Sequence, residues 1–145
     1  MIKVTIVCVG KLKESYWRDA VNEYCKRLSR FCKTEIKELP ERAGLKEEAE
    51  DILRACRGYV FALAVEGKQC PSEVFAEKVK ALCDKGEEIT FVIGSSCGLH
   101  ESVKTAAKEL LSFSQMTFPH QMMRVVLLEQ IYRAFMINSG SEYHK

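Results

Sequence analysis

The sequence predicts an α/β protein with a parallel-type sheet and helices on both of its faces. Short segments rich in β-branched residues alternate with longer segments of helical periodicity along the whole chain, which is typical of strands joined by crossover helices. Residues 59–65, YVFALAV, carry no charged side chain, as expected of a central strand covered on both faces. The chain has 145 residues and neither a repeat nor a linker, so residues 1–145 are expected to form a single domain.

Each expected element follows from a local pattern. Apolar or alternating segments predict five strands, at residues 2–9, 34–39, 59–65, 89–93 and 110–113. Apolar side chains that recur every three or four residues predict five helices, at residues 14–31, 45–56, 72–82, 103–107 and 120–137. Ser72 is the expected N-cap of the third helix, because its hydroxyl can accept a backbone N–H there.

Charge and cysteine content exclude several classes of protein. Lys and Arg number 22 against 20 Asp and Glu, so the net charge of +2 gives no general field for binding nucleic acid. The seven cysteines are odd in number and include no C-x-x-C pair, which favours reduced thiols over disulfides or a metal site. There is no signal peptide and no apolar run of membrane-spanning length, so we expect a cytoplasmic protein without a membrane partner.

Three loops are candidate sites, because ligands of parallel α/β sheets bind beyond the carboxyl ends of the strands. The first, VEGKQC at residues 65–70, departs from the phosphate-binding P-loop: Ala62 stands in place of its first glycine and Gln69 in place of its magnesium-binding Ser or Thr. No G-x-G-x-x-G follows any expected strand, which disfavours a dinucleotide site.

The two later loops carry small and aromatic residues. IGSSCGLH, residues 93–100, is either an ordinary turn or a loop whose backbone approaches a ligand closely. His100 is expected to cap or pack there rather than to catalyse. SFSQMTFPH, residues 112–120, carries Phe113, Met116 and Phe118, and exposing all three to water would be costly. They are expected to pack on the core or around a flat aromatic ligand.

The expected last helix is apolar on almost every side. Glu129, Gln130 and Arg133 form its only polar stripe, with Arg124 opposite. A surface helix needs one apolar stripe, so this helix is either enclosed within its own domain or packed against a second copy. A small α/β domain offers few neighbours to a C-terminal helix, and we therefore expect a two-fold homodimer.

Four quoted segments carry a resemblance that spans nearly the whole chain: VGKLKESYW, FVIG followed by GLH, LSFSQMTFPHQMMRVVLLEQIYRAF, and the terminal YHK. Together they resemble the ribosomal RNA large subunit methyltransferase H family, which belongs to the SPOUT methyltransferases. The resemblance implies a SPOUT fold with a C-terminal deep trefoil knot, in which the last segment passes through an earlier loop. Such threading is an exception among protein topologies.

The resemblance also implies a cofactor, S-adenosylmethionine, held by backbone groups and apolar walls of the three loops and completed by a partner subunit. The implied cofactor-binding residues are Leu63, Gly94, Phe113, Ser114, Gln115, Met116, Thr117 and Phe118.

The sequence departs from the family pattern beside Gly94, because the family usually has a second glycine where Ser95 stands. If Ser95 adopts a positive φ, the substitution costs about 1 kcal/mol and weakens cofactor binding.

The implied reaction is methyl transfer to N3 of a pseudouridine in 23S rRNA, on the assembled ribosome. The N3–H imide is a weak acid and has to lose its proton before or during attack. The implied catalytic residues are His144, Arg133 and Tyr143. His144 would assist proton loss or, when charged, stabilise the imide anion with Arg133 and Lys145, while Tyr143 contacts RNA.

Two other interpretations stay open. The first is a ribosome-associated dimer that has lost methyl transfer, with Ser95 as the reason. The second is an unknotted, monomeric nucleotide-binding module of flavodoxin type. Cofactor binding separates the enzyme from the first, and the solution mass and the course of the last helix separate it from the second.

Overall fold

Five strands form one sheet in the order β2-β1-β4-β3-β5, and all neighbouring strands are parallel. The computed structural model describes residues 1–145. The strands are β1 (Lys3–Val9), β2 (Lys33–Leu39), β3 (Tyr59–Lys68), β4 (Ile89–Ile93) and β5 (Glu109–Leu111). The predicted parallel sheet is confirmed.

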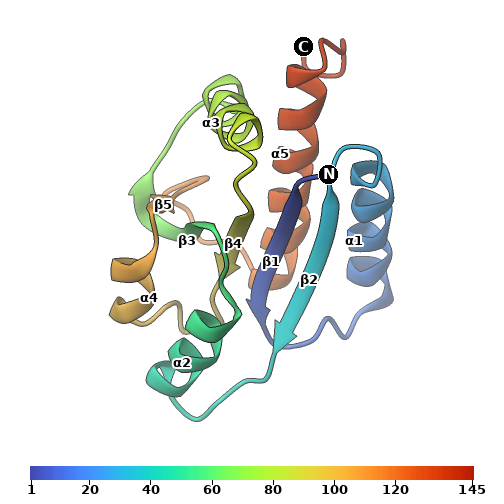
Figure 1. Ribbon diagram of the computed structural model, residues 1–145. Helices are drawn as coiled ribbons and strands as arrows, with labels where there is room; N and C mark the ends of the chain where they lie inside the picture. Colours follow the sequence, from blue (N-terminus) through green and yellow to red (C-terminus); the bar gives the residue numbers. More distant parts are fainter.

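Helices cover both faces of the sheet, also as predicted (Figure 1). The helices are α1 (Ser15–Leu28), α2 (Leu45–Ala55), α3 (Ser72–Asp84), α4 (Glu101–Ala106) and α5 (His120–Asn138). α1, α3 and α5 share the larger hydrophobic cluster on one face, whereas α2 and α4 share the smaller cluster on the other. Successive residues of β1 point to opposite faces, so Ile6 joins the larger cluster and Val7 the smaller one.

The strand order contradicts the flavodoxin-type interpretation. Flavodoxin-like sheets have the order 2-1-3-4-5, whereas β4 here lies between β1 and β3. The pairing of β1 with β4 runs from Val4 opposite Ile89 to Cys8 opposite Ile93. The chain therefore returns from β3 to the middle of the sheet, where β4 lies between β1 and β3, before it adds β5 at the edge beside β3.

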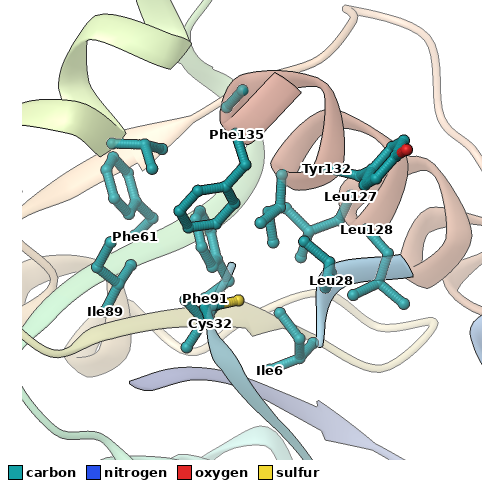
Figure 2. Packing of buried hydrophobic residues seen from close by; sticks show 14 of the residues in the cluster. Ile6, Leu28, Cys32, Phe61, Ile89, Phe91, Leu127, Leu128, Tyr132 and Phe135 are labelled. Carbon is teal, nitrogen blue, oxygen red and sulfur yellow. The ribbon is translucent and has the colours of Figure 1, made fainter. Parts of the chain in front are cut away.

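The larger core lies between the sheet and α5 (Figure 2). Phe61 and Phe91 on neighbouring strands stack with ring centroids 4.9 Å apart, a geometry that adds to the free energy of burying two aromatic rings. Leu127 and Leu128 of α5 are fully buried in the same cluster. The core thus depends on the last helix of the chain.

α5 has neighbours on two sides within its own chain, because it packs against both α1 and α3. Its buried side chains are Arg124, Leu127, Leu128, Ile131, Tyr132, Ala134, Phe135 and Met136. No side chain of α5 is among the large hydrophobic residues left exposed. Enclosure within its own domain therefore explains most of its apolar surface, and the composition of this helix alone no longer argues for a second copy.

Two details differ from the predictions near β3. Pro71, not Ser72, is the N-cap of α3, and no side chain caps this helix; the Ser72 hydroxyl instead donates to Oε1 of Gln130 on α5, at 2.8 Å. β3 continues to Lys68 because Leu111 of β5 pairs with both Leu63 and Lys68 across an irregularity in the register.

None of the helices combines the length and apolar character that a membrane crossing requires.

Candidate active site

A cavity of ≈ 620 Å³ lies at the carboxyl edge of the sheet, around the ends of β3, β4 and β5 and the start of α5. Its volume is within the range of small-molecule sites. Most of the predicted cofactor-binding residues line it: Leu63, Gly94, Phe113, Ser114, Met116, Thr117 and Phe118. Gln115 is the exception, because it is exposed and does not line the cavity. The three predicted loops thus meet around one cavity.

The loop after β4 requires a glycine at position 94. A Cβ on Gly94 would lie 2.5 Å from the carbonyl oxygen of Gly98 and 2.9 Å from Leu99 Cδ2. The loop folds back on itself this tightly because Ser95 and Gly98 form an antiparallel bridge. Gly94 therefore gives the backbone room at the cavity wall, and any side chain there would displace the loop.

Ser95 causes none of the strain considered above, since no residue other than glycine has a positive φ. Its hydroxyl donates to Oε1 of buried Glu48 on α2, at 3.1 Å, and accepts the backbone N–H of Cys97, at 3.3 Å. The hydroxyl thus fastens the loop to α2. His100 is the N-cap of α4 and accepts the backbone N–H of Ser102 at 3.1 Å, which confirms its predicted capping role.

Two serines shape the segment after β5. The Ser112 hydroxyl lies 3.1 Å from the carbonyl oxygen of Val65 and 3.0 Å from that of Ser114, and donates its one proton to either. The Ser114 hydroxyl accepts the backbone N–H of Met116 at 2.9 Å. Met116 stands at the tip of this turn and is 76% exposed. Met116 therefore does not pack on the core but lines the cavity, which leaves contact with a ligand as its expected role, whereas Phe113 is partly buried against the core.

Three charged or titratable side chains at the cavity were missed by the sequence reasoning. Lys104 pairs with Glu66 at 2.9 Å, and its hydrogen bond lowers the pKa of Glu66. Burial, together with the positive charge of Arg124, lowers the pKa of His120, so its imidazole is neutral near pH 7. Glu66 and His120 lie within two of the loops that the sequence singled out, at residues 65–70 and 112–120, and that position was the available signal.

Arg124 joins α5 to the ends of two strands. It is 1% exposed, and its Nη2 donates to the carbonyl oxygens of Gly10, at 2.7 Å, and Val9, at 3.1 Å. Its Nη1 pairs with Glu38 Oε2 at 2.8 Å. Strand ends leave carbonyl groups without ladder partners, and this guanidinium supplies the donors. The polar residue predicted on the opposite side of α5 from its polar stripe is therefore a buried clamp.

The three predicted catalytic residues lie together at the other end of α5. Arg133 donates from Nη2 to Glu129 Oε1 at 2.7 Å, and the Tyr143 hydroxyl donates to the other oxygen of Glu129 at 3.0 Å. Arg133 Nη1 lies 3.1 Å from His144 Nδ1. Because arginine only donates, Nδ1 accepts, and the proton on Nε2 points to the Glu73 carboxylate. Burial and the bond to Glu129 raise the pKa of Tyr143.

The cavity and this cluster occupy opposite ends of α5. His120 and Met123 line the cavity, whereas Arg133 lies ten residues beyond Met123, which is about 15 Å along a helix. Figure 1 shows the C-terminus at the end of α5 that lies away from the arrowheads of β1 and β2. None of the three catalytic candidates lines the cavity of its own chain.

The sequence matches the profile of the family described as predicted SPOUT methyltransferase over residues 2–144. The chain belongs to the SPOUT methyltransferase family. It is also 50% identical, over 159 aligned residues, to "Ribosomal RNA large subunit methyltransferase H" of Streptococcus pyogenes serotype M49 (strain NZ131), with 99% of this chain and all of that protein covered. A protein of the same name from S. pyogenes serotype M3 (strain ATCC BAA-595 / MGAS315) matches equally well.

Solved structures show the same fold at low identity. A probable methylase family protein from Haemophilus influenzae Rd KW20 superposes with a TM-score of 0.58 at 14% identity, covering 99% of this chain and 70% of that one. A putative methylase family protein from Neisseria gonorrhoeae superposes with a TM-score of 0.54 at 10% identity, covering 90% and 81%. These structures support the SPOUT assignment at the level of fold.

SPOUT methyltransferases of this kind take their methyl group from S-adenosylmethionine, which is therefore the cofactor. The cavity fits it in size and character. Eleven of its 22 lining residues are hydrophobic, which suits an adenine ring. At Gly94 a Cβ would collide with the backbone, so this loop can approach a ligand closely.

Proposed function

We propose that this SPOUT methyltransferase methylates N3 of a pseudouridine in 23S rRNA on the assembled ribosome. The observation that carries the proposal is the 50% identity, over 99% of the chain, to a protein named for methylating large-subunit ribosomal RNA. The protein would act in the cytoplasm as a homodimer, each chain forming one domain over residues 1–145.

Leu63, Gly94 and residues 113–118 would hold the cofactor, with Gln115 taking part only through its backbone because its side chain does not line the cavity. When bound, S-adenosylmethionine supplies an activated methyl group on a sulfonium. The chain then has to hold the RNA base in line with that methyl group, exclude water, and stabilise the charge that develops on the base.

His144, Arg133 and Tyr143 would act on the base. His144 has both ring nitrogens engaged, by Arg133 and by Glu73, so it must release one contact to accept the imide proton. The guanidinium of Arg133 would stabilise the anion left on the base, and Lys145 would add a second positive charge. Tyr143, which lies below Arg133 with the guanidinium carbon 4.8 Å from its ring centroid, would contact RNA.

The homodimer is supported by the separation of the two halves of the site. The cofactor cavity lies at the start of α5, and the catalytic cluster lies at its end. In a two-fold dimer the tail of one chain can reach the cavity of the other. Each of the two sites would then combine residues from both protomers.

The trefoil knot is supported by three close approaches of residues 110–130 to the end of β3 and the start of α3, on either side of the connection between them. The backbone N–H of Ser112 donates to Lys68 at 3.0 Å, and a Cβ on Gly67 would lie 2.8 Å from the carbonyl group of Leu110. Further along, Ser72 bonds Gln130. In addition, the chain leaves α4 on one face of the sheet and enters α5 on the other. A crystal structure in which α5 reaches its place without threading would contradict the knot.

Methylation of purified ribosomes that lack the modification tests the function. We expect incorporation of labelled methyl from S-adenosylmethionine at one pseudouridine, located by mass spectrometry of 23S rRNA digests. His144→Ala should lower kcat, because the imide proton then loses its acceptor. Cofactor binding without methylation of such ribosomes would indicate a non-catalytic member, and an unchanged rate for His144→Ala at saturating ribosome would remove its proposed role.

Mixing two inactive variants tests the shared site. Gly94→Ala damages the cavity and His144→Ala damages the tail. A heterodimer of the two has one site with both parts intact, and half of the dimers in an equal, re-equilibrated mixture are heterodimers. We expect the mixture to recover about a quarter of wild-type activity. No recovery, with heterodimers present by mass spectrometry, would mean that each chain works alone.

A further inference from the structure

The connection between β1 and α1 presents two lysines that have no partner. Lys11 and Lys13 are exposed, and neither takes part in an ion pair or a side-chain hydrogen bond, unlike Lys3, Lys78, Lys80 and Lys104. Two carboxylates near this loop serve other groups, since Glu38 is held by Arg124 and Glu41 lies against Gly10, and Glu14, which follows Lys13, forms no ion pair with either lysine. Two uncompensated positive charges thus point to solvent from one short loop.

The loop that carries them is held rigidly. Its backbone N–H groups donate from Gly10 to Leu39, at 2.7 Å, and from Leu12 to Glu38, at 3.2 Å. Arg18 Nη1 donates back to the carbonyl oxygens of Leu12, at 3.1 Å, and Lys13, at 2.5 Å. Leu12 itself is buried. A loop that needed only to join β1 to α1 would not require this many fixed points, so the lysines stand at defined positions.

An exposed aromatic pair follows directly. Tyr16 is 62% exposed at the first turn of α1, and its ring packs edge to face against Trp17, with centroids 5.1 Å apart. Among the aromatic side chains of the protein, only Tyr16 is among the exposed large hydrophobic residues. Single-stranded RNA binds where aromatic faces and positive charges stand side by side, and Tyr16 follows the two lysines within one loop and helix turn.

The surface lies beside the cofactor cavity. Cys8 pairs with Ile93 across neighbouring strands, so the chains leave the sheet side by side, into the lysine loop after β1 and into the cavity wall at Gly94 after β4. Arg124, whose neighbour Met123 lines the cavity, bonds the carbonyl oxygen of Gly10. The connection to α1 runs along the edge to which the arrowheads of β1 and β2 point (Figure 1).

We infer that Lys11, Lys13 and Tyr16 form a docking surface for single-stranded RNA next to the cofactor cavity. The lysines bind phosphate groups, and Tyr16 stacks on a base of the strand that carries the target nucleotide. This rests on the proposed function, since it names the part of the chain that grips that substrate. A second copy is a poorer occupant, because a two-fold contact through this surface would bring four unpaired lysines together.

The chain has one tryptophan, and Trp17 lies against the proposed stacking ring, so its fluorescence reports directly on the surface. The probe is an eight-nucleotide oligouridine, titrated into the full chain at several salt concentrations. We expect quenching of Trp17 and an affinity that falls with salt. Lys11→Glu with Lys13→Glu should weaken binding at least tenfold and reduce the salt slope by about 1.4, at about 0.7 for each lost phosphate contact on single strands. Tyr16→Ala should weaken the affinity for oligouridine about five- to hundredfold, with the salt slope unchanged. For this variant the affinity is measured by the fluorescence anisotropy of a labelled oligouridine.

The control is Lys33→Glu with Lys85→Glu. Both residues are exposed and unpaired, and they lie at the opposite edge, one at the start of β2 and the other just after α3. This variant has the same net charge as the first, and its oligouridine affinity should match the wild type. Methylation of ribosomes by the Lys11→Glu/Lys13→Glu variant should show a raised KM with unchanged kcat and cofactor affinity.

Two results would overturn the inference. The first is an equal RNA affinity for the two double variants. The second is a change from dimer to monomer in Tyr16→Ala, measured by light scattering, which would mean that a second copy covers this ring. Its failure is distinguishable from that of the proposed function. If the wild type methylates ribosomes while the variant keeps its KM, the docking surface alone is wrong. If the wild type binds oligouridine through this loop but does not methylate ribosomes, the proposed reaction alone is wrong.

Discussion

Replacing Arg124 by methionine removes the clamp between α5 and the ends of β1 and β2 while nearly keeping the side chain's length. The guanidinium satisfies two main-chain carbonyl groups, those of Val9 and Gly10, at a position that is 1% exposed. Methionine would leave both carbonyl groups buried without a donor. Each buried, unsatisfied group costs about 1–3 kcal/mol.

The net effect is smaller than the sum of these terms. The Glu38 side chain is 33% exposed, so water can replace Arg124 there, and that ion pair adds little. Removing the arginine also removes the cost of burying its charge and its Nε, which has no partner. We therefore expect Arg124→Met to lower the free energy of unfolding by about 2–4 kcal/mol, and Arg124→Lys, which keeps the charge and fewer bonds, to lower it by about half as much.

Urea unfolding followed by far-ultraviolet circular dichroism measures this difference. Protein concentration must be the same for all variants, because assembly adds to apparent stability. The matched control is Arg54→Met, since Arg54 is 72% exposed and should change stability by less than about 0.5 kcal/mol. If Arg124→Met were as stable as this control, the hydrogen bonds to Val9 and Gly10 would not hold α5 to the sheet.

Three further outcomes follow from the geometry. Gly94→Ala should weaken S-adenosylmethionine binding at least tenfold by calorimetry, because its Cβ would lie 2.5 Å from the carbonyl oxygen of Gly98. Gly86→Ala is the control, because no atom lies within 4 Å of a Cβ there, and it should leave the affinity unchanged. Equal affinities for the two variants would contradict the tight loop at Gly94. Glu129→Gln should lower kcat and spare cofactor affinity, since Glu129 holds both Arg133 and Tyr143. An unaffected rate would show that these two contacts do not position the C-terminal residues. Burial raises the pKa of Cys8 from 9.0 to about 11, so the folded state keeps a proton that the unfolded state loses. The free energy of unfolding should therefore fall as pH rises above 9, by about 2 kcal/mol at pH 11. Cys8→Ala should reduce that slope in urea unfolding at pH 8 to 10.5, and an unchanged slope would assign it to other groups.

The predictable part of the fold rests on local patterns. The uniformly apolar strands predicted the parallel sheet, and the positions of their carboxyl ends predicted the three loops that line the cavity. The end of β3 was missed because its last residue is defined by pairing with Leu111, 43 positions later in the chain, and no local pattern reports such a contact. The enclosure of α5 was considered but ranked below a homodimer, because it depends on α1 and α3 lying on the same face as α5, which no local pattern shows.

The candidate site shows the same division. Gly94 and Phe113 belong to short motifs that a reader of sequence can single out, whereas Arg124 looked like one polar residue on an apolar helix. Its role depends on the carbonyl groups at the end of β1, which become neighbours only in the folded chain. His120 and Lys104 were missed for a similar reason, because each reaches the cavity from a helix rather than from a loop.

The contribution of α5 to both the core and the cavity has a consequence for how the protein is made. A ribosome synthesises the chain from its N-terminus, so this helix emerges last. Until it emerges, the larger face of the sheet has only α1 and α3 as cover and the cavity lacks a wall. A nascent or prematurely terminated chain therefore exposes Phe61, Phe91 and their neighbours and has no place for the cofactor, which makes it a substrate for chaperones and proteases.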